Sequence, residues 1–109
     1  MTDELLQVST QKVDGDVTVL TVTGELDRDS LHILGAAADD ALATGATRLV
    51  LALGALTFCD SSGLRLFVEL HKRTELHLAD VRPPVATVIQ VANLQRMLAL
   101  HPTVEDAIG

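Results

Sequence analysis

An uninterrupted apolar run at positions 49–53, Leu-Val-Leu-Ala-Leu, restricts the possible folds of this chain more than any other feature. A run without polar alternation is typical of a strand that is covered on both faces, as in parallel sheets packed between helices. Positions 57–64 then read Thr-Phe-Cys-Asp-Ser-Ser-Gly-Leu, and a helical pattern follows over 64–73. The pattern predicts a buried strand over 48–53 that leads through a polar turn into a helix.

Other segments predict strands around this one. Residues 5–9 and 17–22 alternate apolar and polar side chains, as half-buried strands do. The intervening Asp14-Gly15-Asp16 favours a tight turn, so these two strands are predicted to form an antiparallel hairpin. A polar loop is predicted over 24–30, and further strands over 76–81 and 97–100.

Helices are predicted between the later strands. The first is capped by Ser30 or Asp29 and ends at Thr44, before Gly45. A third helix follows the Pro-Pro pair at 83–84 and ends near Asn93, and Thr103 followed by two acids predicts the start of a short fourth helix. The apolar positions of the three longer helices are Leu31, Leu34, Ala38, Ala41 and Leu42, then Leu64, Phe67, Val68 and His71, then Val85, Val88, Ile89 and Leu94.

Strands that alternate with helices imply βαβ crossovers and a parallel or mixed sheet, which defines the α/β class. The chain has 109 residues and no repeat, low-complexity tract or linker. We therefore expect a single domain over residues 1–109, with its core over about 5–101.

Composition excludes several functions. Aromatic residues make up only 2% of the chain and the formal net charge is −7, so base stacking and phosphate-backbone binding are both disfavoured. Cys59 is the only cysteine, which rules out an intrachain disulfide and suits a reducing cytoplasm, where it is expected to behave as a small buried hydrophobe. The first four residues, Met-Thr-Asp-Glu, include two acids where a signal peptide needs a basic segment, and no apolar run approaches the ~20 residues of a membrane span. We expect a cytoplasmic protein.

The turn at positions 60–63 places Asp60, Ser61 and Ser62 at a helix N-terminus, where unpaired backbone N–H groups and the helix dipole favour added negative charge. The simplest interpretation is that one of these residues caps the helix, which Asp and Ser do routinely. Asp60 has two further interpretations: it orients Ser61, or it contacts a partner.

The sequence gives little support for an enzymatic function. Ser61 and His71 lie ten residues apart along one predicted helix, and the sequence Gly-x-Ser-x-Gly is absent. No metal-ligand spacing or phosphate-binding glycine loop occurs, so no metal or cofactor is expected. The remaining histidines, His32, His77 and His101, are interpreted as surface or interfacial residues.

Two motifs give the chain a family resemblance. Thr23-Gly24-Glu25-Leu26-Asp27, followed later by the 56–64 segment that contains Asp-Ser-Ser-Gly, resembles the STAS family, and most closely its single-domain anti-sigma factor antagonists. The resemblance runs from about residue 6 to 100. It implies a STAS-type mixed sheet of four to five strands with three to four helices. Relatives carry a longer segment between Gly63 and Leu76, and here residues 72–75 must turn the chain without glycine.

The resemblance also implies a function. In this family the first serine of Asp-Ser-Ser-Gly, which is Ser61 here, is phosphorylated by a partner that is both a serine kinase and an anti-sigma factor. The unphosphorylated form binds that partner and releases a sigma factor, phosphorylation abolishes binding, and a phosphatase resets the switch. The alternative within the family is an accessory subunit of a membrane transporter. The implied partner-binding residues are Glu25, Asp27, Asp60, Ser62, Gly63 and Arg65.

Overall fold

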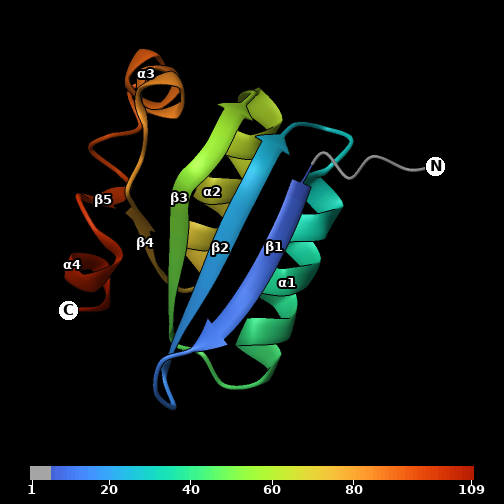
Figure 1. The fold of residues 1–109 in the computed structure, drawn as a ribbon, viewed down its shortest axis with the longest axis vertical. Helices are drawn as coiled ribbons and strands as arrows, with labels where there is room; N and C mark the ends of the chain where they lie inside the picture. The colour runs from blue at the N-terminus through green and yellow to red at the C-terminus, as the bar shows by residue number, and fades with distance from the viewer. Residues whose placement is uncertain (1–5) are drawn as a thin grey trace.

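The computed structural model describes residues 6–109, which form one five-stranded sheet and four helices (Figure 1). The sheet order follows the chain, β1-β2-β3-β4-β5; β1 and β2 are antiparallel and every later pair is parallel. This confirms the α/β class and the mixed sheet. The elements are β1 (Leu6–Lys12), β2 (Val17–Leu26), α1 (Leu31–Ala43), β3 (Arg48–Cys59), α2 (Ser61–Arg73), β4 (Glu75–Ala79), α3 (Pro83–Val91), β5 (Ala99–His101) and α4 (Val104–Ile108).

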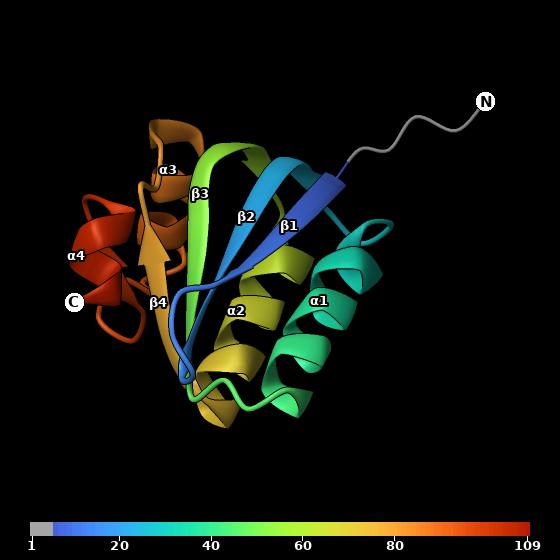
Figure 2. The ribbon, with the colours of Figure 1, turned by 60° about the horizontal axis from the view of Figure 1, so that its bottom comes forward.

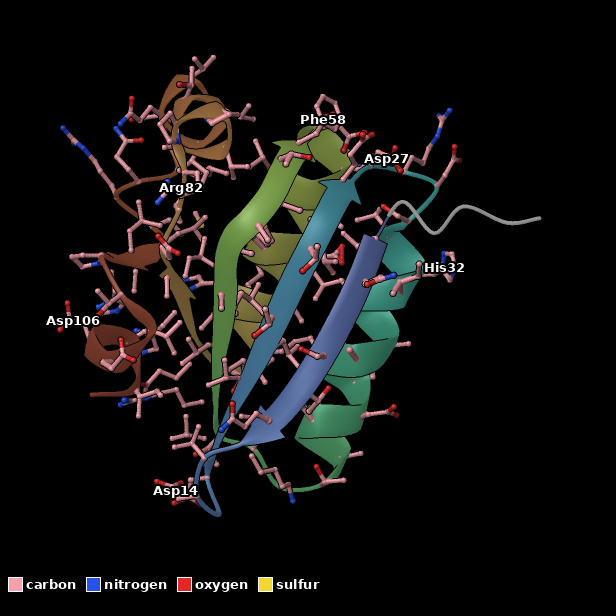
Figure 3. All side chains as sticks on the ribbon, in the orientation of Figure 1. Asp14, Asp27, His32, Phe58, Arg82 and Asp106 are labelled. Carbon is pink, nitrogen blue, oxygen red and sulfur yellow. The ribbon has the colours of Figure 1, made fainter. Side chains whose placement is uncertain are left out.

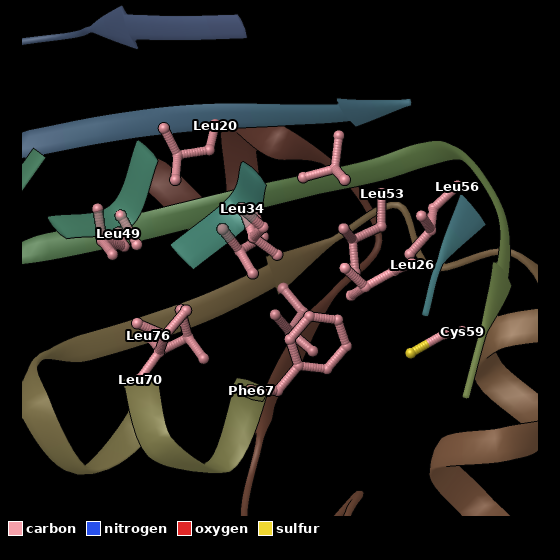
Figure 4. Packing of buried hydrophobic residues seen from close by; sticks show 14 of the residues in the cluster. Leu20, Leu26, Leu34, Leu49, Leu53, Leu56, Cys59, Phe67, Leu70 and Leu76 are labelled. Atoms are coloured by element: carbon pink, nitrogen blue, oxygen red, sulfur yellow. The ribbon is translucent and has the colours of Figure 1, made fainter. Parts of the chain in front are cut away.

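The two faces of the sheet are covered unequally. Helices α1 and α2 lie side by side across one face (Figure 2), over a core rich in leucine that includes Leu20, Leu34, Leu53 and Phe67 (Figure 4). The other face carries a smaller cluster of valine and alanine, which includes Ala107 of α4. With so few aromatic residues in the chain, the main core is filled mostly by branched aliphatic side chains.

Strand β3 is twice as long as predicted. Residues 49–53 are buried, as expected, but the strand continues to Cys59 because β2 also continues and pairs with it. Glu25 lies opposite Phe58 and Leu26 opposite Cys59. The predicted 24–30 loop was therefore wrong over 24–26: backbone pairing overrides the weak strand propensity of Gly-Glu there.

Helix α2 begins at Ser61, three residues before the predicted start, because Asp60 caps it. Its buried stripe is Leu64, Phe67 and Leu70, so the predicted stripe was wrong at its C-terminal end, where His71 is exposed. The turn without glycine is a single residue, Thr74, whose hydroxyl donates to the Thr47 carbonyl at 2.8 Å.

The distal elements follow the prediction with shifted ends. Strand β4 ends at Ala79 because Asp80 adopts a positive φ of 57°. Asn93 takes the left-handed conformation after α3, as predicted, with φ 60°. The last strand starts two residues late, at Ala99, because the Leu98 amide still donates to the Leu94 carbonyl in a turn at 2.9 Å. The short helix after Thr103 is confirmed, and the Thr103 hydroxyl caps it by accepting from the Asp106 amide at 3.1 Å.

Candidate functional site

The two sequence motifs meet at one end of the sheet, where β2 and β3 run parallel. The Thr57 hydroxyl donates to the Gly24 carbonyl at 3.1 Å, and the Asp60 amide donates to the Leu26 carbonyl at 3.2 Å. Asp27 and Phe58 accordingly lie at the same end of the molecule, opposite the hairpin that carries Asp14 (Figure 3). Motifs separated by about thirty residues in the sequence therefore form one continuous surface.

Asp60 fixes the start of α2. Its backbone is extended, with φ −97° and ψ −173°, and its carboxylate accepts from the Gly63 amide at 3.1 Å. The capping interpretation is confirmed. Ser61 is the first residue of the helix and its side chain is exposed, while Ser62 is half-buried. The first turn thus presents a serine hydroxyl to solvent at the positive end of the helix dipole.

Gly63 allows α2 to approach the ends of β2 and β3 closely. A Cβ at this position would lie 2.6 Å from the Cys59 sulfur and 2.9 Å from a methyl carbon of Leu26, both too close for real contacts. Gly63 is buried, so its role in the site is to let the helix dock with Ser61 facing outward. The glycine requirement comes from packing, and its backbone has no positive φ.

A second loop, between β2 and α1, is held rigid by Asp27. One carboxylate oxygen of Asp27 accepts from the Asp29 amide at 3.0 Å and from the Ser30 amide at 3.1 Å. The Ser30 hydroxyl points backward and donates to the Glu25 carbonyl at 2.9 Å. Ser30 occupies the N-cap position of α1, but its side chain makes no cap bond, so the predicted cap by Ser30 or Asp29 was wrong: Asp27 binds the loop amides in their place.

These two loops enclose an open, polar hollow. It has a volume of about 320 Å³, and its lining residues are Asp27, Arg28, Asp29, Asp60, Ser61 and Ser62. Of the residues predicted for partner binding, the structure brings Asp27, Asp60 and Ser62 into this hollow with Ser61. Arg65 lines an adjoining hollow of about 230 Å³ that Ser62 and Arg28 share. Glu25 is exposed near the end of β2, just before the loop.

On its other side Ser61 borders an apolar groove that the sequence reasoning missed. The groove has a volume of about 280 Å³ between α2 and α3, and its lining residues are Ser61, Leu64, Thr87, Val88, Val91 and Ala92. The Val91 side chain is 82% exposed, and nearby at the end of β3 the Phe58 side chain is 47% exposed. The available signal was α3 itself: its sequence PPVATVIQV is apolar on more than the one face that a core requires.

Two side chains at or beside the site, Ser61 and Cys59, are of types that serve as nucleophiles in other proteins. Ser61 and His71 lie at opposite ends of α2, about 15 Å apart along its axis. Burial, together with the negative charge of Asp60, raises the pKa of the Cys59 thiol to about 12, so this cysteine is a protonated hydrophobe, as predicted. Within residues 6–109, no group of three or more histidine, cysteine or acidic side chains converges as a metal site.

The chain belongs to the STAS domain family: the family model matches residues 7–107. A search of curated proteins finds no match. No helix within residues 6–109 has the length and apolar character needed to cross a membrane. The fold, the paired motifs and the domain match therefore agree on the family.

Solved structures give the same result. An anti-sigma factor antagonist from Mycobacterium paratuberculosis has a TM-score of 0.87 at 25% identity, covering 98% of this chain and 94% of its own. The unphosphorylated form of the anti-sigma factor antagonist SpoIIAA has a TM-score of 0.79 at 25% identity, covering 94% and 93%. The phosphorylated Bacillus SpoIIAA has a TM-score of 0.69 at 23% identity, covering 94% and 96%, and shows likeness of fold.

Proposed function

We propose that this protein is an anti-sigma factor antagonist whose binding is switched off by phosphorylation of Ser61. The observation that carries the proposal is the position of Ser61: exposed, first in α2, and flanked by a polar hollow and an apolar groove. The structural relatives that are anti-sigma factor antagonists support it. The protein acts by binding, and as the substrate of a serine kinase it contributes no catalytic residue.

The location suits a phosphoryl acceptor. A kinase supplies Mg-ATP and the base that orients the hydroxyl, so the acceptor needs only access and position. Phosphoserine adds about −1.5 to −2 charges at pH 7. At the N-terminus of α2 the helix dipole favours that charge, so phosphorylation leaves the domain folded.

The same charge is unfavourable once a partner covers it. A docked partner removes water from the rim of the groove, and an unpaired charge in a desolvated contact is costly. We assign the polar part of the partner surface to Glu25, Asp27, Asp60, Ser62 and Arg65, with Gly63 setting the docking of the helix. The groove adds an apolar part beside Ser61. Phosphorylation therefore acts at the boundary between the two.

The partner is an anti-sigma factor with serine kinase activity, and a phosphoserine phosphatase restores the binding form. Binding of the unphosphorylated protein frees a sigma factor, so transcription changes without direct contact with nucleic acid. A partner of this kind implies a cytoplasmic location.

Affinity capture with mass spectrometry tests the proposal. Immobilised wild-type protein should retain an anti-sigma kinase that the Ser61→Asp protein does not retain. With Mg-ATP, that kinase should add one phosphate, which Ser61→Ala loses and Ser62→Ala keeps. A phosphate mapped to another residue would overturn the assignment, and capture of a membrane transporter subunit in place of a kinase would support the alternative function in this family.

The groove can be tested separately with that kinase. Val91→Asp places a charge on the most exposed apolar side chain beside Ser61 and should weaken binding at least tenfold. Val13→Asp is the matched control, because Val13 is 40% exposed on the distant hairpin and should bind like wild type. Equal binding of both variants would remove the groove from the partner surface.

A further inference from the structure

The last two elements of the chain are attached to the sheet by few apolar contacts. Strand β5 has three residues, lies at the edge of the sheet beside β4 and leaves Leu100 39% exposed. Helix α4 has five residues, of which Ala107 alone is fully buried. Short edge elements with little buried surface are the first to open locally. Val104, Ala107 and Ile108 pack on the valine and alanine cluster of the sheet, and other interactions must add to this small apolar contact.

A chain of polar contacts supplies them. The His77 Nδ1 and His101 Nε2 atoms lie 2.7 Å apart, and the His77 Nε2 atom lies 2.9 Å from a carboxylate oxygen of Glu75. Glu75 also pairs with the Arg48 guanidinium, which donates to the Ile108 carbonyl at 2.7 Å. The contacts thus run from β5 through β4 and β3 to the end of α4, so both distal elements are tied to the interior of the sheet.

The hydrogens in this chain follow from its geometry. An ionised carboxylate only accepts hydrogen bonds, so His77 donates from Nε2 to Glu75. This hydrogen bond, assisted by the positive charge of Arg48, holds the pKa of Glu75 below its ordinary value and keeps it ionised. With both histidines neutral, His77 Nδ1 is then the acceptor and His101 Nε2 the donor.

The number of protons bound by the two rings determines whether this contact can persist. When the pair binds one added proton, one ring becomes an imidazolium and the other stays neutral. A single hydrogen still lies between His77 Nδ1 and His101 Nε2, donated by the charged ring to the neutral one. A second added proton places two N–H groups and two positive charges against each other at 2.7 Å, and the contact must open. The His77 side chain is only 17% exposed, so water screens this repulsion poorly.

We propose that His77 and His101 form a proton-operated clasp that holds β5 and α4 on the sheet and releases them when the pair takes up its second proton. Other charged groups around the pair leave this count unchanged. Glu75 and Arg48 belong to the series of polar contacts described above. Glu105 and Asp106 of α4 are exposed, and within residues 6–109 neither forms a hydrogen bond or ion pair with His77 or His101. Since α3 links β4 to β5, release loosens one end of the helix that lines the groove beside Ser61.

Amide hydrogen exchange between pH 7.5 and 5 tests the clasp. The Asp80 amide donates to the His101 carbonyl at 3.0 Å and reports on β5, and the Ala107 amide reports on α4. After correction for intrinsic exchange rates, opening of both should rise about tenfold per pH unit in acid, because the open form binds one more proton. Amides in the middle of β3 should stay protected.

Two variants separate the clasp from general acid effects. His101→Gln removes one titrating ring, and its amide can still donate to His77; the acid-dependent opening should disappear. His32→Gln on exposed α1 is the matched control and should open like wild type. Opening that rises equally in wild type and His101→Gln, or that spreads across the whole sheet, would overturn the proposal.

A second measurement uses the wild-type protein alone. Long-range proton–nitrogen NMR spectra at pH 7.5 distinguish the two neutral imidazole tautomers. Both His77 and His101 should carry hydrogen on Nε2 and none on Nδ1. A His77 ring with hydrogen on Nδ1 would contradict the contact chain, whatever the variants show. Neither measurement requires a partner or Ser61, so this proposal stands or fails independently of the proposed function.

Discussion

The middle and the end of β3 differ in what they contribute. Residues 49–53 are buried on both faces, and Leu49, Leu51 and Leu53 expose none of their surface. Beyond Gly54 the strand becomes exposed in part: Phe58 protrudes, and Asp60 and Ser61 follow at its end. One strand therefore serves the core with its first half and leads to the proposed partner surface with its second half.

The difference shows how stability and switching are kept apart. A buried residue cannot change charge without unfolding the domain, whereas an exposed one at a helix N-terminus can. As substitutions move from the middle of β3 toward Ser61, their cost in unfolding free energy should fall and their effect on partner binding should rise. The predictions below follow that gradient.

Leu51→Ala should cause the largest loss of stability, about 2–5 kcal/mol, because it leaves a cavity in the main core. Urea unfolding measures it. Leu100→Ala, at a leucine that is 39% exposed, is the control and should cost under ~1 kcal/mol. A Leu51→Ala loss as small as that of the control would mean that β3 is peripheral.

Gly63→Ala should cost less, about 1–2 kcal/mol. Its Cβ would crowd Cys59 and Leu26, which costs ~1–3 kcal/mol, while alanine returns up to ~1 kcal/mol in helix propensity. Gly35→Ala on α1 is a matched control, since nothing lies within 4 Å of its added carbon; it should stabilise the protein. Thermal melts measure both effects. If the melting temperatures of the two variants shift in the same direction, the packing role of Gly63 is refuted.

Asp60→Ala should cost about 1 kcal/mol, the usual value of a lost N-cap. Asp60→Ser keeps a capping oxygen and should recover most of that stability. If Asp60→Ser folds normally but binds the partner weakly, the carboxylate has the additional partner contact that the sequence left open. Chemical denaturation and partner titration together decide this.

The sequence predicted the alternation of strands and helices, the hairpin and the buried middle of β3, because these depend on local periodicity and turn residues. It failed where pairing between distant segments decides the outcome. Residues 24 and 25 are glycine and glutamate, which have weak strand propensity, yet residues 24–26 are strand because residues 56–59 lie beside them. The start of α2 shifted for a local reason, the Asp60 cap, which the capping interpretation had already identified.

Within the site, the sequence identified the motif residues but not the apolar groove beside them. Resemblance identified Ser61, and the structure places Asp27, Asp60 and Ser62 beside it. The groove escaped prediction because α3 lies more than twenty residues away in sequence. The contact between His77 and His101 escaped for the same reason: only the register of β4 and β5 brings the rings together.

Partner binding and thermal stability of Ser61→Asp test the central claim most directly. A carboxylate at this helix N-terminus gains about 0.3–1 kcal/mol from the dipole, so the free variant should melt within a few degrees of wild type. Its calorimetric affinity for the anti-sigma kinase should fall at least tenfold, while Ser61→Ala binds like wild type and resists release by ATP. Ser9→Asp, which adds the same charge on the exposed surface of β1, should behave like wild type in both measurements. Normal binding by Ser61→Asp, or loss of binding only because the free domain has melted, would contradict the account.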